Sequence, residues 1–174
     1  MRFRDDIVHE SPTVKNLGVL FDKYVTWDSH VSALVRKCTV ILIGLAHLRH
    51  CIPPNLLPHL VNALVISHVR YCLTVYGNGS QNNMHRLDKI LNFALRIISG
   101  KRKFDHISNV RDELGWPTAR LLYEQLSLSM LHKIRCTGEP QALASQILVN
   151  SQIRNRLTRQ NSDLMLPRVR TEAG

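Results

Sequence analysis

Apolar and polar residues alternate in short runs over the first 25 positions, which is typical of β-strands. Phe3, Ile7 and Val8 precede a turn at 10–12 that contains Pro12, and a second run follows it at 14–21. Such runs on both sides of a proline-bearing turn predict a β-hairpin. Because a lone hairpin is only marginally stable in water, we expect it to pack on a larger sheet or on a helical layer.

From Trp27 onward apolar residues recur every three or four positions, which predicts helices. Asp28 is a favoured N-cap residue and begins the first helix, which ends before Pro53. A second helix is expected at about 55–76. The predicted inward positions are Val31, Leu34, Val35, Cys38, Leu42 and Leu45 in the first helix, and Leu57, Leu60, Val61, Leu64, His68 and Val75 in the second.

A third helix is predicted at about 82–99, with Gly100 as the C′ residue that ends it. At about 100° per residue, one face of this helix is apolar, and the opposite face is basic with one aromatic residue. The loop after it adds three more cations. The apolar face carries Leu87, Ile90, Leu91, Ala94 and Ile98, the basic face carries Arg86, Lys89, Phe93 and Arg96, and the loop is Lys101, Arg102 and Lys103.

Shorter segments complete the pattern. They are a turn at 108–114, a helix capped by Thr118 that reaches about Arg135, and a last helix from Pro140 to about Val149. We therefore expect a mainly α fold in three regions. These are an N-terminal β-hairpin at 1–25, a helical bundle at 26–150, and a polar, partly disordered tail at 151–174.

The distribution of charge indicates a polyanionic partner. The 174 residues carry a formal net charge of +10, from 23 Lys and Arg against 13 Asp and Glu. Ten basic residues and one acidic residue, Asp88, lie between Ser29 and Lys103, so nine of the ten net charges fall in this stretch. Lys and Arg neutralise phosphates and release counterions, and Phe93 could stack on a base or sugar. The pattern favours nucleic-acid contact over a face that is merely solvated.

Cysteine spacing and hydropathy indicate a reducing, intracellular compartment. Cys38, Cys51, Cys72 and Cys136 lie singly in apolar-periodic segments, unlike the dense cysteines of secreted disulfide scaffolds. The first residues contain no apolar signal-peptide core, and the weakly charged run at 50–85 contains three prolines. We expect a soluble, intracellular protein without a membrane span.

Two patterns could hold metal ions. The pairs His47/Cys51 and His68/Cys72 have helical spacing and could together form a tetrahedral zinc site. Core cysteines beside half-exposed histidines are the alternative, which we favour because no Cys-x-x-Cys motif supports zinc.

The second pattern is Phe3-Arg4-Asp5-Asp6, which fits the aromatic-x-Asp-Asp box by which reverse transcriptases hold two metal ions. Two-metal phosphoryl transfer needs a further carboxylate from another strand, and nothing upstream supplies one. We therefore interpret this segment as an exposed acidic hairpin, and we assign no catalytic residue and no cofactor to the chain.

An ordered series of motifs resembles the C-terminal part of reverse transcriptases from non-LTR retrotransposons of the jockey-like group. The resemblance begins at Val14-Lys15-Asn16-Leu17-Gly18-Val19-Leu20-Phe21-Asp22 and extends almost to the end of the chain. Its other segments are 27–31, 71–72, 75–77, 87–100, 114–117 and 166–172.

The resemblance implies a palm-end hairpin followed by a helical thumb that grips a template–primer duplex. Lys15, Leu17 and Gly18 would then lie in the primer-grip hairpin, and Arg86, Lys89 and Arg96 would lie on a thumb helix. In that family the catalytic Asp-Asp box lies several dozen residues before the hairpin, whereas Asp6 precedes Leu17 by eleven. The resemblance thus implies a truncated polymerase whose fingers and most of whose palm are missing, with Mg²⁺ used only by the full-length enzyme.

The sequence therefore predicts nonspecific binding of an RNA or RNA–DNA duplex without polymerase activity. The predicted contact residues are Lys15, Leu17, Gly18, Arg86, Lys89, Phe93, Arg96, Lys101, Arg102 and Lys103. Two alternatives stay open. One is a host-adopted helical module that binds other proteins, and the other is a zinc-dependent helical domain.

Overall fold

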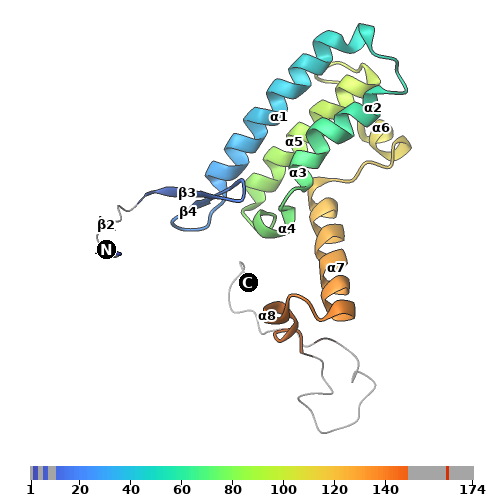
Figure 1. Ribbon diagram of the computed structural model, residues 1–174. Coiled ribbons are helices and arrows are strands. Elements are labelled where there is room, and N and C mark those ends of the chain that lie inside the picture. Colours follow the sequence, from blue (N-terminus) through green and yellow to red (C-terminus); the bar gives the residue numbers. More distant parts are fainter. Residues whose placement is uncertain (1, 4–5, 8–10, 149–163, 165–174) are drawn as a thin grey trace. The chain divides into compact units, whose positions relative to one another are not determined.

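A computed structural model describes residues 2–3, 6–7, 11–148 and 164, and the chain divides into two compact units, Met1–Leu126 and Ser127–Gly174 (Figure 1). The expected mainly α fold with an N-terminal hairpin is confirmed. The strands are β1 (Arg2–Phe3), β2 (Asp6–Ile7), β3 (Thr13–Asn16) and β4 (Val19–Asp22). The helices are α1 (Asp28–Leu48), η1 (Arg49–Cys51), α2 (Leu57–Val61), η2 (Asn62–Ile66), α3 (Ser67–Arg70), α4 (Leu73–Tyr76), α5 (Gln81–Ser99), α6 (Ser108–Glu113), α7 (Ala119–Thr137) and α8 (Gln141–Ala144).

The main hairpin turns at Leu17-Gly18, so the predicted turn at Pro12 is wrong. Strands β3 and β4 are antiparallel with Asn16 opposite Val19, and both turn residues have positive φ, 46° and 86°. A two-residue turn with positive φ matches the right-handed twist of the strands. Gly18 adopts this backbone conformation without steric cost. Strands β1 and β2 form a separate pair with Phe3 opposite Asp6.

A single carboxylate organises the loop between β4 and α1. Asp22 accepts hydrogen bonds from the backbone N–H groups of Tyr24 at 3.0 Å, Thr26 at 3.0 Å and Trp27 at 2.9 Å, and from the Thr26 hydroxyl at 3.1 Å. The Thr26 N–H is the largest of the causes that lower the pKa of Asp22. The predicted N-cap at Asp28 is wrong, because Trp27 occupies that position with φ 67° and no side chain caps the helix.

Helices α1 and α5 lie side by side, and the α2–α3 segment packs beside them to close one core (Figure 1). The predicted inward stripes of both helices are confirmed, with Val35 and Ile98 at half-buried edges. Buried stripe residues are Val31, Leu34, Cys38, Leu42 and Leu45 of α1, and Leu87, Ile90, Leu91 and Ala94 of α5. This removal of apolar surface from water is the main stabilising term of the fold.

The predicted helix at 55–76 is interrupted twice. A π turn, η2, inserts an extra residue into the helix, and Cys72 has a left-handed backbone with φ 55° between α3 and α4. After the π turn the inward phase moves by one residue, so that Val65 and Val69 are buried whereas Leu64 is exposed and His68 is half-buried. The predicted inward positions Leu64 and Val75 are therefore wrong.

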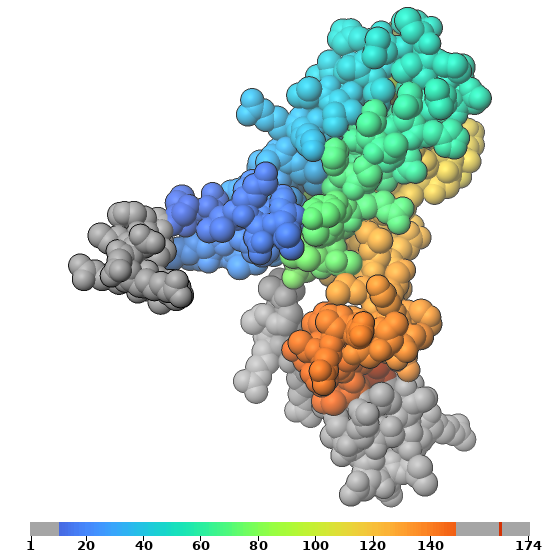
Figure 2. All heavy atoms as spheres, viewed as in Figure 1, coloured from blue at the N-terminus to red at the C-terminus, as the bar shows by residue number. Residues whose placement is uncertain are grey.

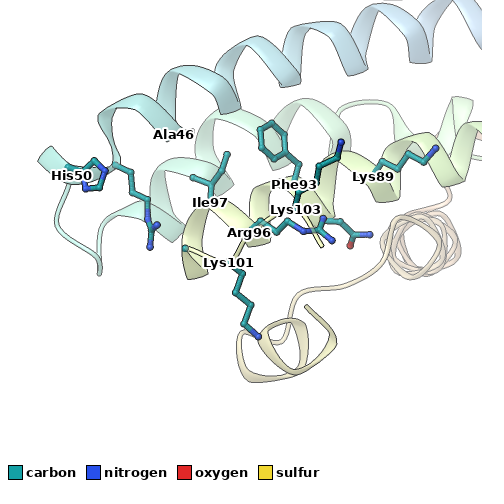
Figure 3. A pocket seen from close by; sticks show the side chains of 11 residues that line it. Ala46, His50, Lys89, Phe93, Arg96, Ile97, Lys101 and Lys103 are labelled. Carbon is teal, nitrogen blue, oxygen red and sulfur yellow. The ribbon is translucent and has the colours of Figure 1, made fainter. Parts of the chain in front are cut away.

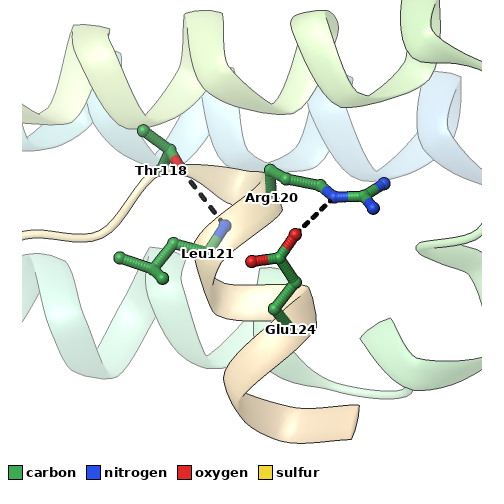
Figure 4. A network of polar contacts seen from close by, with 4 residues as sticks. All are labelled: Thr118, Arg120, Leu121 and Glu124. Atoms are coloured by element: carbon green, nitrogen blue, oxygen red, sulfur yellow. Dashed lines mark hydrogen bonds and ion pairs between the residues drawn. The ribbon is translucent and has the colours of Figure 1, made fainter.

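The later helices begin and end largely as their capping residues predict. Ser80 caps α5, Gly100 ends it with φ 70°, and the Thr118 hydroxyl accepts the Leu121 N–H at 3.2 Å at the start of α7 (Figure 4). Arg120 and Glu124 form an exposed ion pair at 2.8 Å on the same helix. The last helix, α8, ends at Ala144, so its predicted extent was too long. The predicted tail lies outside the described residues except Leu164.

One helix among the described residues, the α1–η1 segment Asp28–Cys51, is long and apolar enough to cross a membrane. Its buried stripe belongs to the core shared with α5. The helix is therefore compatible with the expected soluble state.

Candidate nucleic-acid interface

A hollow of about 700 Å³ lies where the end of α1 and η1 meet the second half of α5 and the loop after it. Basic and apolar side chains line it together (Figure 3). The cationic lining residues are Arg49, Lys89, Arg96, Lys101 and Lys103, accompanied by His50. The remaining lining residues are Ala46, Asn92, Phe93, Ile97 and Gly100.

Among the described residues, none that lines this hollow is acidic. Asp88, the one acid of the basic stretch, instead accepts the backbone N–H of Ala119 at 2.9 Å at the start of α7. A carboxylate at a helix N-terminus is stabilised by the free N–H groups and by the helix dipole. The positive charge around the hollow is therefore not neutralised by an ion pair within its lining.

Arg49 reaches the hollow from η1 and packs against Gly100 at the end of α5. A Cβ added at Gly100 would overlap the Arg49 guanidinium, so the glycine allows this close approach as well as the positive φ. The last carbonyl groups of α5 carry partial negative charge, which stabilises a cation placed there. The two ends of the sequence stretch 49–100 thus meet at one corner of the hollow.

Arg96 and Lys101 differ in how far their polar groups are satisfied. The Nε atom of Arg96 is buried and has no hydrogen-bond partner among the described residues. The Lys101 Nζ donates to the His106 carbonyl at 3.0 Å, and the Arg102 N–H donates to the Asp105 carboxylate at 2.7 Å. These bonds order the loop after α5, whereas Arg96 retains an unused donor beside the hollow.

The predicted contact residues of α5 and its loop separate into two groups. Five of them come together around the hollow: Lys89, Phe93, Arg96, Lys101 and Lys103. Arg102 is exposed on the same loop but does not line it. Arg86 lies apart, because its guanidinium donates to the Ser32 hydroxyl at 2.8 Å and to the Asn83 side-chain oxygen at 3.3 Å. Arg86 therefore joins α5 to α1.

The hairpin residues line a second hollow of about 480 Å³ between the hairpin, α1 and α3. Lys15, Leu17 and Gly18 lie on its hairpin side, and Lys37 and Tyr71 lie on the helical side. The Tyr71 hydroxyl donates to the Leu17 carbonyl at 2.7 Å, while the Leu17 side chain is 83% exposed. The turn is thus held by its backbone, and its side chain points outward.

His30 makes a further connection between the hairpin and the helices. Its Nδ1 accepts the backbone N–H of Leu20 at 3.4 Å, and its ring packs edge-on against Tyr76 at 4.7 Å between centroids. Burial lowers the pKa of His30. The accepting Nδ1 requires the neutral imidazole, so hairpin docking favours the unprotonated form.

Three residues of the basic surface were missed from the sequence. Arg49 and His50 reach the hollow from η1, and no local pattern connects them with α5. Phe104 is 89% exposed, with the Lys103 Nζ 5.5 Å from its ring centroid. Its position directly after three cations could have identified it as a stacking residue, whereas Phe93 is half-buried against the core.

The cysteines and histidines do not gather into a metal site within the described residues. No group of three or more His, Cys, Asp or Glu is placed to hold a metal ion there. All four cysteines are free, and burial raises the pKa of the Cys38 thiol to about 11. That thiol is a packing residue of α1.

Comparison with known proteins adds no functional assignment: no protein-family model, no curated protein and no solved structure matches this chain.

Proposed function

We propose that this chain binds the phosphate backbone of RNA or RNA–DNA duplexes without reading their sequence, as a thumb-like part of a reverse transcriptase related to those of non-LTR retrotransposons. The observation that carries the proposal is the gathering of five cationic side chains from η1, α5 and the following loop around one hollow, with no acid in its lining within the described part of the chain. Its partners are then the duplex and the palm and fingers of a polymerase, inside the cell.

The physical basis is electrostatic. Each Lys or Arg that neutralises a phosphate releases condensed counterions, so affinity falls as salt rises. Phosphate contacts hold and orient a duplex but carry no sequence information. The exposed Phe104 adds a face for stacking at a frayed or single-stranded end. We assign no catalytic carboxylate to the chain, and Mg²⁺ belongs to the polymerase with which it would act.

The test is the salt dependence of binding to a blunt RNA–DNA duplex with 5′-hydroxyl ends, followed by fluorescence anisotropy. Gln replacement of the lining residues Lys89, Arg96, Lys101 and Lys103 should flatten the slope of log affinity against log salt by roughly 0.9 for each phosphate that is no longer neutralised. Gln replacement of Arg36, Arg70, Lys133 and Arg135 removes the same charge from exposed positions that do not line the hollow. Equal slopes in the two variants would contradict the proposal.

Three exposed apolar side chains on α1 support a second candidate function, a helical protein-interaction module. Val40, Ile43 and Leu48 are 66%, 46% and 56% exposed, and the helix forms an open edge of the first unit (light blue to cyan in Figure 2). Binding through these apolar side chains would change little with salt, because burial of apolar surface is not screened. Weak salt dependence of partner binding would favour this alternative.

A further inference from the structure

The hollow between η1 and α5 differs in shape from a surface that only tracks a duplex backbone. Its volume of about 700 Å³ lies within the roughly 300–1,000 Å³ of small-molecule sites. A duplex has a convex outer surface, so backbone contact alone leaves such a depression unfilled. The depression therefore suits a small group that enters it.

The charge around the hollow exceeds what one backbone phosphate neutralises. Arg49, Arg96 and Lys103 are carried by three different segments, and Lys89 and Lys101 add to them. An internal phosphodiester carries one negative charge, whereas a terminal triphosphate carries several. Cations that line one hollow from separate segments are matched best by a compact polyanion.

Arg96 supplies a second, independent observation. Its buried Nε has no acceptor among the described residues, and a buried donor without a partner is unfavourable. Arg96 also lines the hollow, so a phosphate oxygen there would accept a charge-assisted hydrogen bond from its terminal guanidinium nitrogens. Ala46, Phe93 and Ile97 form an apolar wall beside it, which suits the face of a base or the edge of a sugar (Figure 3).

We propose that this hollow is a binding site for the terminal polyphosphate of a nucleotide, with its nucleoside against Phe93. The nucleotide is either a free nucleoside triphosphate or the 5′-triphosphate end of an RNA strand, since both present the same chemistry. The proposal rests on the nucleic-acid surface proposed above, but its ligand can be tested without a duplex.

The experiment is isothermal titration calorimetry of the full chain with ATP, AMP and inorganic tripolyphosphate, without divalent metal so that each ligand keeps its full charge. We expect one site that binds ATP about tenfold more tightly than AMP, because one charge-assisted hydrogen bond contributes roughly a factor of ten. Arg96→Gln and Lys103→Gln should each weaken ATP binding by about tenfold. Arg36→Gln, which removes an exposed cation of α1 outside the hollow, should not.

One further variant, and the exposed position of Lys103, protect the interpretation against simple charge attraction and against misfolding. Phe93→Leu keeps an apolar side chain and should weaken ATP but leave tripolyphosphate binding unchanged. Lys103 is exposed, so its replacement does not disturb the core. Equal affinities for ATP and AMP, or equal losses in the Arg96, Lys103 and Arg36 variants, would overturn the proposal.

The source of the nucleotide is decided with two RNA duplexes of one sequence that carry 5′-triphosphate or 5′-hydroxyl ends. Preference for the triphosphate end over ATP assigns a strand end to the hollow, and the reverse order assigns a free nucleotide. If the hydroxyl duplex binds but no terminal phosphate increases affinity, this inference fails and the proposed function stands. If ATP binds and neither duplex does, the proposed function fails and the nucleotide site stands.

Discussion

The Asp22 carboxylate illustrates how much one side chain determines locally. It accepts four hydrogen bonds from the loop that leads into α1, and three of the donors are backbone N–H groups. Hydrogen bonds to the charged form lower the pKa of a carboxyl group. The folded state thus favours ionised Asp22, and the loop conformation depends on that charge.

Replacement of Asp22 by Asn should destabilise the fold because a side-chain NH₂ cannot accept these bonds. The lowered pKa means that the stabilisation is complete above the ordinary value of 3.8 and is lost as the pH falls through the folded value. Urea unfolding at pH 7 and pH 3 should show a smaller acid effect in D22N than in the wild type. Asp28→Asn is the control, since no cap bond is formed there. Equal acid sensitivity of D22N and wild type would contradict the role of Asp22.

Gly100 satisfies two requirements at once, a positive φ and room for Arg49. Gly100→Ala should cost about 1–3 kcal/mol of unfolding free energy from the backbone alone, plus the displacement of the guanidinium. Gly115→Ala is the matched control, because its φ is also positive and nothing lies within 4 Å of the added Cβ. Thermal unfolding should show a larger loss of stability for G100A than for G115A. In an Arg49→Ala background this difference should disappear. Equal losses would show that Arg49 does not occupy that space.

Among the helices, the π turn η2 is the least regular element of the core. Its extra residue lets Leu57 and Val61 face the same core as Val65 and Val69. Deletion of exposed Ala63 should convert the segment into a regular α-helix without rotating either flank, at a cost of about 1 kcal/mol or less. Deletion of exposed Ala33 from α1, which has no such turn, rotates its flank by about 100° and should abolish cooperative urea unfolding. Loss of folding in both deletions would contradict this account.

Docking of the hairpin on the helices should depend on pH through His30. Its folded pKa is lowered below 6.5, so the unfolded chain binds more protons and the fold loses stability as the pH falls below 6.5. Facing groups from the packed elements are the Leu20 N–H of β4 and the Tyr76 ring of α4, with Lys37 and His68 lining the same hollow. His30→Asn keeps an acceptor but does not titrate. The free energy of unfolding should therefore change less between pH 7 and pH 5 in this variant than in the exposed control His85→Asn. An unchanged pH profile in H30N would assign the effect to another histidine.

For the chain as a whole, the exposed apolar side chains Val40, Ile43 and Leu48 of α1 should drive self-association. The net charge of +10 opposes it, so association should increase as salt screens the repulsion. Sedimentation velocity at rising concentration should show larger species for the wild type and monomer for a Val40→Ser, Ile43→Ser variant. Val75→Ser, which changes an exposed apolar residue of another helix, is the control. A wild type that stays monomeric in high salt would contradict the prediction.

Local pattern was sufficient for the features that depend on neighbouring residues. The inward stripes of α1 and α5, the Thr118 cap and the Gly100 terminus follow from spacing of three or four residues and from capping chemistry, both of which act within a turn or two. The basic face of α5 was predicted from the rotation of about 100° per helical residue. Lys89, Phe93 and Arg96 were therefore placed together correctly from the chain's periodicity.

Contacts between distant segments decided the rest. Tyr71 holds the Leu17 turn from 54 residues away, and the extra residue of η2 changes which side of its helix is buried. Arg49 meets Gly100 only when η1 packs at the end of α5. In this position Arg49 lines a hollow together with the basic residues of α5. No local spacing encodes such meetings, because they depend on how the apolar stripes of separate helices pack, and that packing is a property of the folded core.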